Sequence, residues 1–139
     1  MGAADVFVDS GGFLALWDAG DEHHLPALAL QNQLTRKRRR FLTTDYIVDE
    51  TATLLLSRHS HRAAVDFLDS ISRTDALRLE WVDQDRFEAA VAWFQRHADK
   101  MWSFTDCVSF VVMRELNVRE AFTTDHHYTQ AGFNALLRS

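Results

Sequence analysis

Short runs of β-forming apolar residues alternate along this chain with stretches that have helical spacing. The β-forming runs are DVFV just before Asp9, FLTT at residues 41–44, LRLEWV at 77–82 and AFTT at 121–124. The helical stretches include residues 13–17, 28–34, 45–57, 62–72, 84–98 and 104–116. Strands that are separated by helices pair in parallel through right-handed crossovers, and the helices then cover both faces of the sheet. The alternation therefore predicts an α/β fold, a three-layer α/β/α sandwich with a central parallel sheet.

The length of the chain restricts this fold to a single unit. The chain has 139 residues, of which 47% are hydrophobic, and this is enough for one core but too little for two ordinary domains. We therefore expect one domain over residues 1–139. Near the C-terminus, GFNALL at residues 132–137 fits either a short fifth strand or a last helical turn.

Signals for secretion and for membrane attachment are not found in the sequence. The single cysteine, Cys107, cannot form an internal disulfide and fits a small core residue better than a nucleophile. The N-terminal residues lack the basic flank and the apolar run of a secretory signal, and no segment approaches the roughly 18 apolar residues of a membrane span. We therefore expect a cytoplasmic protein with no membrane attachment.

The charge of the chain excludes a general attraction to nucleic acid. Acidic residues outnumber basic ones by 20 to 15, so any binding of phosphates has to be local. The one conspicuous basic run is RKRRR, which comprises Arg36, Lys37, Arg38, Arg39 and Arg40. It could bind RNA phosphates, or it could be a solvated loop or helix end, and the sequence leaves both interpretations open.

Four acidic residues are predicted to reach the same edge of the sheet. Asp9 ends the first strand and Asp125 follows the fourth, whereas Asp106 lies in the first turn of a helix. Glu50 lies further along its helix, but its longer side chain points back toward the helix N-terminus. The carboxyl ends of parallel strands and the amino ends of the following helices share one edge, which is where ligands bind in such folds.

Some of these acids have a structural alternative. Ser103 and Asp106 have the S-x-x-D spacing of a capping box, which would explain the carboxylate by helix capping alone. Asp45, Asp49 and Asp83 lie close to the same edge, but an N-capping or exposed position explains each of them better.

A group of carboxylates at one site requires a compensating positive charge. Two carboxylates about 4 Å apart repel each other by roughly 4 kcal/mol at an effective dielectric constant of 20. Oxygen ligands without a cysteine cluster favour Mg²⁺ or Mn²⁺, and Lys or Arg partners are the alternative. Such a cation suits phosphodiester hydrolysis, in which Asp125 or Glu50 could orient the water while Ser10 and Thr123 serve as hydroxyl donors.

The four acidic motifs together resemble those of the PIN-domain ribonucleases of the VapC toxin type. The resemblance extends over nearly the whole chain and rests on VFVDSGGFLAL, LTTDYIVDETATLL, SFTDCVSFVVM and AFTTDHHYTQAGF, in this order. It implies a PIN-like parallel sheet and a Mg²⁺- or Mn²⁺-dependent endoribonuclease site formed by Asp9, Glu50, Asp106 and Asp125. It also implies RNA as the substrate, a homodimer, and a VapB-type antitoxin protein whose tail covers the site.

The motifs depart from the family pattern at two places. DSGG stands where the family more often has a Thr-Ser or Ser-Ser pair, and FTTD stands where it often has TFD. These departures affect the hydroxyl roles expected of Ser10 and Thr123. The histidine pairs, including His126 and His127, have no zinc-site spacing and are interpreted as surface residues. A second functional class stays open, in which the chain binds RNA or a protein without cutting.

Overall fold

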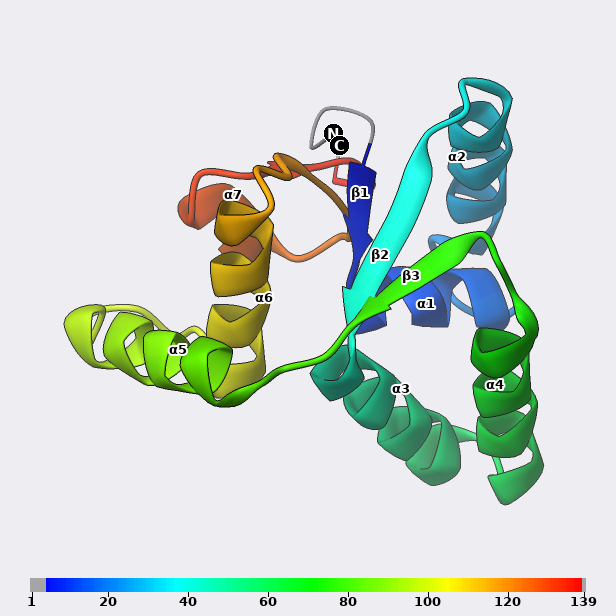
Figure 1. The fold of residues 1–139 in the computed structure, drawn as a ribbon. Coiled ribbons are helices and arrows are strands. Elements are labelled where there is room, and N and C mark those ends of the chain that lie inside the picture. Colours follow the sequence, from blue (N-terminus) through cyan, green and yellow to red (C-terminus); the bar gives the residue numbers. More distant parts are fainter. Residues whose placement is uncertain (1–4, 139) are drawn as a thin grey trace.

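The structure is a computed structural model, and it describes residues 5–138. Its five strands form one sheet in which every neighbouring pair is parallel. The spatial order is β3-β2-β1-β4-β5, so the first strand is the central one (Figure 1). The strands are β1 (Asp5–Val8), β2 (Arg40–Thr44), β3 (Leu77–Glu80), β4 (Glu120–Phe122) and β5 (Asn134–Ala135). The predicted α/β class with a central parallel sheet is confirmed.

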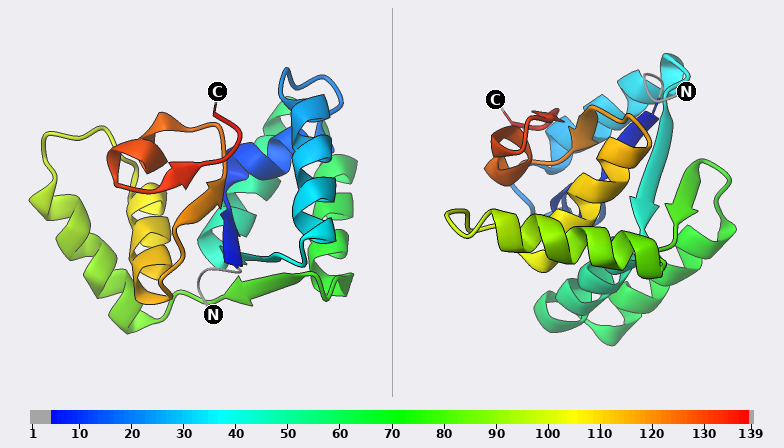
Figure 2. Two further views of the ribbon diagram at one scale, coloured as in Figure 1. Left: turned by 90° about the horizontal axis from the view of Figure 1, so that it is seen from above. Right: turned by 60° about the vertical axis from the view of Figure 1, so that its left-hand side comes forward.

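Helices cover both faces of the sheet, as the alternation predicts. They are α1 (Ser10–Trp17), α2 (His24–Arg36), α3 (Asp45–Arg58), α4 (His61–Arg73), α5 (Gln84–Arg96), α6 (Phe104–Glu115) and α7 (His126–Gln130). Helices α5, α6 and α7 lie on one side of the sheet and α1, α2 and α4 on the other (Figures 1 and 2). Helix α3 extends away from the carboxyl ends of the strands (Figure 1).

The N-terminal part of α1 differs from the expected turn. Ser10, Gly11 and Gly12 form the first helical turn instead of a separate loop. A Cβ atom on Gly12 would lie 2.1 Å from the backbone oxygen of Phe122, so only glycine permits this close approach of α1 to β4. The contact holds the end of β1 beside the end of β4.

The C-terminal region contains one element that the sequence did not predict and one that it left open. The short helix α7 follows Asp125 directly, and its five residues are too few to show helical periodicity. Residues of the GFNALL segment form the two-residue strand β5 at the edge of the sheet. The expected helix end at Leu116 is its C-cap, one residue beyond α6.

The core fixes the position of α6, the helix that carries Asp106. Val6 and Phe7 of the central strand are fully buried, as expected for a strand covered on both faces. Phe110 of α6 packs against the rings of Trp102 and Tyr128, with centroid distances of 5.2 and 5.1 Å. Cys107 is buried in the same core, as the sequence predicts.

Candidate active site

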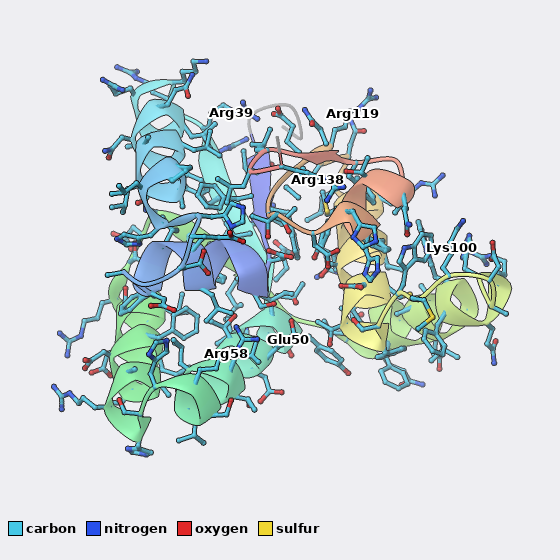
Figure 3. All side chains as sticks on the ribbon, turned by 180° about the vertical axis from the view of Figure 1, so that it is seen from behind. Arg39, Glu50, Arg58, Lys100, Arg119 and Arg138 are labelled. Atoms are coloured by element: carbon cyan, nitrogen blue, oxygen red, sulfur yellow. The ribbon has the colours of Figure 1, made fainter. Side chains whose placement is uncertain are left out.

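One pocket at the carboxyl edge of the sheet brings together all four predicted acids. The acids come from the ends of β1 and β4 and from helices α3 and α6, and Figure 3 labels Glu50 on α3. We call this site the acidic pocket. It is lined by Asp9, Ser10, Ile47, Glu50, Leu54, Met101, Ser103, Asp106, Asp125, His127 and Tyr128.

Asp9 is the most buried of the four acids, with 5% of its surface exposed. It is the N-cap of α1, where one carboxylate oxygen accepts a hydrogen bond from the Gly12 N–H (2.9 Å) and the other accepts from the Thr123 hydroxyl (2.7 Å). Burial raises the pKa of Asp9 to about 7; Asp125 and Asp106 also raise it, and the two hydrogen bonds oppose the rise. In the cation-free protein this carboxyl group is therefore only partly ionised at neutral pH.

Asp106 caps its helix and also lines the acidic pocket. It forms the predicted capping box, accepting from the Ser103 N–H (3.1 Å) while its own N–H donates to the Ser103 hydroxyl (3.0 Å). The same carboxylate lies 3.0 Å from Nδ1 of His127 and faces the pocket. Burial raises the pKa of Asp106, and Asp125 adds to the rise, while the contacts with Ser103 and His127 oppose it. Helix capping therefore does not exclude a functional role.

Asp125 and Glu50 are held by hydrogen bonds from neighbouring elements. Asp125 is the N-cap of α7 and accepts from the backbone N–H of His127 (2.8 Å). Its own N–H donates to the Thr123 hydroxyl oxygen (3.0 Å). Glu50 accepts from the Ser10 hydroxyl (2.6 Å), which joins α3 to the first turn of α1. The hydroxyls of Ser10 and Thr123 thus each donate to one of the four carboxylates.

The interpretation of His127 as a surface residue is wrong. Its side chain is 20% exposed, lines the acidic pocket, and lies between Asp106 (3.0 Å) and Asp125 (3.5 Å). His126, in contrast, is exposed at the rim. The sequence signal that could have identified His127 is its place two residues after a predicted site acid. An N-cap side chain accepts a hydrogen bond from the backbone N–H of the second helical residue, which keeps that residue close to the cap.

The donor atoms of the pocket suit a divalent cation. Single ligand atoms of Asp125 and His127, which line the pocket, and of the adjacent exposed His126 lie within 4.8 Å of one another. Within residues 5–138, no Lys or Arg forms a salt bridge with any of the four acids, so the alternative of Lys or Arg partners finds no support there. Carboxylate oxygens are typical ligands of Mg²⁺ and Mn²⁺, and imidazole nitrogen is more typical of softer transition metals.

The competing acids lie outside the acidic pocket. Asp83 is the N-cap of α5 and accepts from the Arg86 N–H (2.9 Å). Asp45 accepts from the Val82 N–H (2.9 Å) and thereby holds the segment after β3 against α3. Asp49 is exposed. Asp83 and Asp49 therefore have the capping and exposed positions that the sequence favoured, whereas the prediction for Asp45 is wrong, because Thr44 caps α3 and Asp45 is partly buried in a tertiary contact.

The basic run lies at the opposite edge of the sheet from the acidic pocket. Arg36 ends α2, Lys37 is its C-cap, and Arg38 has a positive φ of 58° in the following turn. Arg39 forms an ion pair with Glu120, and Arg40 contacts Asp5 at 3.0 Å. Figure 3 shows Arg39 near the amino end of β2, far along the sheet from Glu50. The run does not join the four acids, and its binding of RNA phosphates stays a prediction.

Comparison with known proteins assigns the chain to a family. The PIN-domain family profile matches residues 6–134. The 23S rRNA-specific endonuclease VapC20 of Mycobacterium tuberculosis is 37% identical over 128 residues, which span 92% of this chain and 95% of that protein. A VapC ribonuclease of Archaeoglobus fulgidus is 30% identical over 116 residues, which span 82% of this chain and 73% of that protein.

A solved structure shows that the similarity extends to the fold. The crystal structure of Mycobacterium tuberculosis VapC20, described as a sarcin-ricin loop cleaving toxin, superposes with a TM-score of 0.84 at 36% sequence identity. The match covers 92% of this chain and 95% of the VapC20 chain. No helix within residues 5–138 is long and apolar enough to cross a membrane. The family profile and the similarity to VapC20 show that the chain belongs to the PIN-domain family, with VapC-type ribonucleases among its relatives.

Proposed function

We propose that this protein is a metal-dependent endoribonuclease and the toxin of a VapBC-type toxin-antitoxin pair. The observation that carries the proposal is the convergence of Asp9, Glu50, Asp106 and Asp125 from four separate elements on one pocket. Two of these acids have raised pKa values, as expected of carboxylates that need a cation. When bound, Mg²⁺ or Mn²⁺ would neutralise a phosphate oxygen and favour ionisation of water.

The residues of the pocket would divide the work between binding and proton transfer. Asp9, held by Gly12 and Thr123, and Asp106, held by Ser103, would bind the cation in a fixed orientation. Asp125 or Glu50 would accept the proton of the attacking water. The water oxygen forms the new bond to phosphorus as the bond to the leaving ribose oxygen breaks, which cuts the strand.

The proposal extends to the substrate and the partners. Because the relative VapC20 is named for 23S rRNA and its crystal structure for the sarcin-ricin loop, a structured rRNA loop is the first substrate to test. A VapB-type antitoxin protein and assembly as a homodimer are part of this proposal, and so is a cytoplasmic location. The selectivity for one RNA would come from the surface around the acids, because the acids act on a phosphodiester group that all RNA shares.

The proposal is tested by incubating the purified protein with rRNA fragments and with Mg²⁺, Mn²⁺ or EDTA. We expect cleavage with one of the metals and none with EDTA. Cleavage that EDTA leaves unchanged would contradict metal dependence. Binding of RNA without cleavage under every condition would support the alternative of a non-cleaving binding module.

A matched pair of variants links the activity to the pocket. Asp125→Asn removes the negative charge at the N-cap of α7, and Asp83→Asn makes the same change at the N-cap of α5, outside the pocket. Asparagine caps helices about as well as aspartate, so both variants should fold. We expect Asp125→Asn alone to lose cleavage. Equal loss in both variants would show that the effect is not specific to the pocket.

A further inference from the structure

The hydroxyl of Tyr128 is a buried polar group without a hydrogen-bond partner. The side chain is fully buried, and within residues 5–138 its hydroxyl meets no acceptor or donor with hydrogen-bond geometry. Its ring is held in place by Phe7 and Phe110, with centroid distances of 6.4 and 5.1 Å. Phenylalanine would fill the same space, so packing explains the ring of Tyr128 but not its hydroxyl.

This hydroxyl is close to the acidic pocket. Tyr128 lines the pocket, and three of its acids, Asp9, Asp106 and Asp125, are near enough to raise the pKa of the phenol beyond the effect of burial, the main cause. The nearby Ser109 hydroxyl opposes this rise, but it does not meet the phenol with hydrogen-bond geometry, and it donates to the Thr105 carbonyl oxygen (3.1 Å). Tyr128 therefore stays protonated and has a hydrogen to donate.

We propose that Tyr128 is a positioning residue of the acidic pocket, whose hydroxyl gains an acceptor oxygen when a divalent cation binds. An unsatisfied buried donor destabilises the cation-free protein. Cations held by a few carboxylates retain water molecules and also fix the orientation of the carboxylates, so a bound cation can bring an acceptor oxygen into hydrogen-bond geometry with this hydroxyl. The hydroxyl then favours the occupied state. This inference rests on the proposed function, because it requires a cation in the pocket.

The test compares two tyrosine-to-phenylalanine variants. The chain has two tyrosines, and Tyr46 packs against Phe104 (6.2 Å) outside the residues that line the pocket. Tyr46→Phe is therefore a control for the same chemical change. Mn²⁺ affinity is measured by calorimetry, and the melting temperature is measured with and without Mn²⁺.

We expect Tyr128→Phe to raise the dissociation constant for Mn²⁺ about tenfold, which is the value of one hydrogen bond to a charged group. Its melting temperature without metal should be equal to or higher than that of the wild type. Tyr46→Phe should leave the affinity for Mn²⁺ unchanged. For RNA cleavage at saturating metal, kcat should fall in Tyr128→Phe more than KM changes.

Two results would overturn the inference, and they differ in what they say about the proposed function. Unchanged Mn²⁺ affinity with a lower metal-free melting temperature would make the hydroxyl merely structural, although the wild type binds metal and cuts RNA. Absence of Mn²⁺ binding by the wild type would overturn the proposed function and this inference with it.

Discussion

The two ends of strand β1 carry buried aspartates in opposite electrostatic settings. Asp5 is 3% exposed at the amino end, and its carboxylate contacts the Arg40 guanidinium at 3.0 Å. Asp9 is 5% exposed at the carboxyl end, where it accepts hydrogen bonds from neutral donors. The charged groups that act on its pKa are two other carboxylates, Asp106 and Asp125. Burial alone therefore does not distinguish a structural acid from a functional one; the sign of the neighbouring charges does.

The same contrast extends to the whole of each edge. At the amino edge Glu120 also pairs with an arginine, Arg39, so the charges there are balanced within the fold. At the carboxyl edge burial and neighbouring carboxylates raise the pKa values of Asp9 and Asp106, and within residues 5–138 neither acid forms a salt bridge with Lys or Arg. The amino edge serves stability, whereas the carboxyl edge retains a destabilising arrangement of the kind found at active sites.

The largest expected effect is the loss of cleavage in Asp106→Asn. Losing this carboxylate should lower kcat by more than about a hundredfold, the scale found when one electrostatic catalytic group is removed. The amide oxygen can still accept from the Ser103 N–H, so the metal-free fold should be as stable as the wild type or more so. RNA cleavage and urea unfolding measure the two quantities. A strongly destabilised variant that still cuts RNA would return Asp106 to a capping role alone.

The next effect concerns the stability that metal binding adds. At a free Mn²⁺ concentration a hundred times the dissociation constant, binding to the folded state alone adds about 2.7 kcal/mol. We therefore expect Mn²⁺ to raise the melting temperature of the wild type more than that of Asp9→Asn. Thermal unfolding with and without Mn²⁺ measures the shifts. Equal shifts in the two proteins would show that Asp9 does not share the cation site.

Replacing Asp5 tests the other end of β1. Asp5→Asn removes the buried carboxylate that Arg40 contacts, and because Arg40 is half exposed we expect a moderate loss of about 1–2 kcal/mol in the free energy of unfolding. Metal binding and RNA cleavage should not change when they are measured at a temperature at which the variant is folded. Urea unfolding measures the loss. If Asp5→Asn stabilised the protein, the proposed difference between the two edges would be wrong.

The raised pKa of Asp9 should make the stability of the protein depend on pH. The pKa of Asp9 is about 7 in the folded protein and near 4 when unfolded, so between about pH 4 and about pH 7 the folded state holds a proton that the unfolded state has lost. The stabilisation due to this proton is complete below about pH 4 and is lost as the pH rises toward 7.

Asp9→Asn lacks this titration, so its stability relative to the metal-free wild type should increase as the pH rises from about 5 to about 8. Chemical unfolding in EDTA at several pH values measures the difference. Asp5→Asn provides the comparison at the other end of the strand. A constant difference between Asp9→Asn and the wild type would show that the carboxyl group of Asp9 is ionised throughout.

The smallest expected effect concerns the basic run. Arg39 and Arg40 belong to the ion pairs of the amino edge, so the sharper test replaces the exposed Arg36 and Lys37 with serine. If these two cations contact phosphates, the slope of log affinity against log salt should become shallower by about 1.4 for single-stranded RNA. Fluorescence anisotropy at several salt concentrations measures it. An unchanged slope would favour the solvated helix end.

Much of the fold could be predicted because its periodicities are local. The strand and helix patterns predicted β1 to β4 and α1 to α6, and the parallel sheet followed from their alternation. Helix α7 and strand β5 were missed or left open because five and two residues are too short for a periodic signal. The role of Gly12 was not visible either, since it depends on the backbone of Phe122, more than a hundred residues away.

The acids of the candidate site could be predicted, but their surroundings could not. Asp9, Asp106 and Asp125 lie at strand ends or helix starts, and the change from one periodicity to the next identifies these positions in the sequence. His127 was missed although it follows Asp125 by two residues, because its contact with Asp106 joins α7 to α6 and is set by tertiary packing. The ion pairs of Arg39 and Arg40 were equally hidden, since each joins two strands that are distant in the sequence.

The sequence by itself determined the α/β class and the four acids that share one edge, because strand and helix periods and the order of elements are properties of the local chain. Only the tertiary structure decided which acids are neutralised and which are not. It placed arginines beside Asp5 and Glu120, and carboxylates beside Asp9. The physical reason is that electrostatic energy depends on distances between side chains, and these distances are fixed only when separate elements pack together.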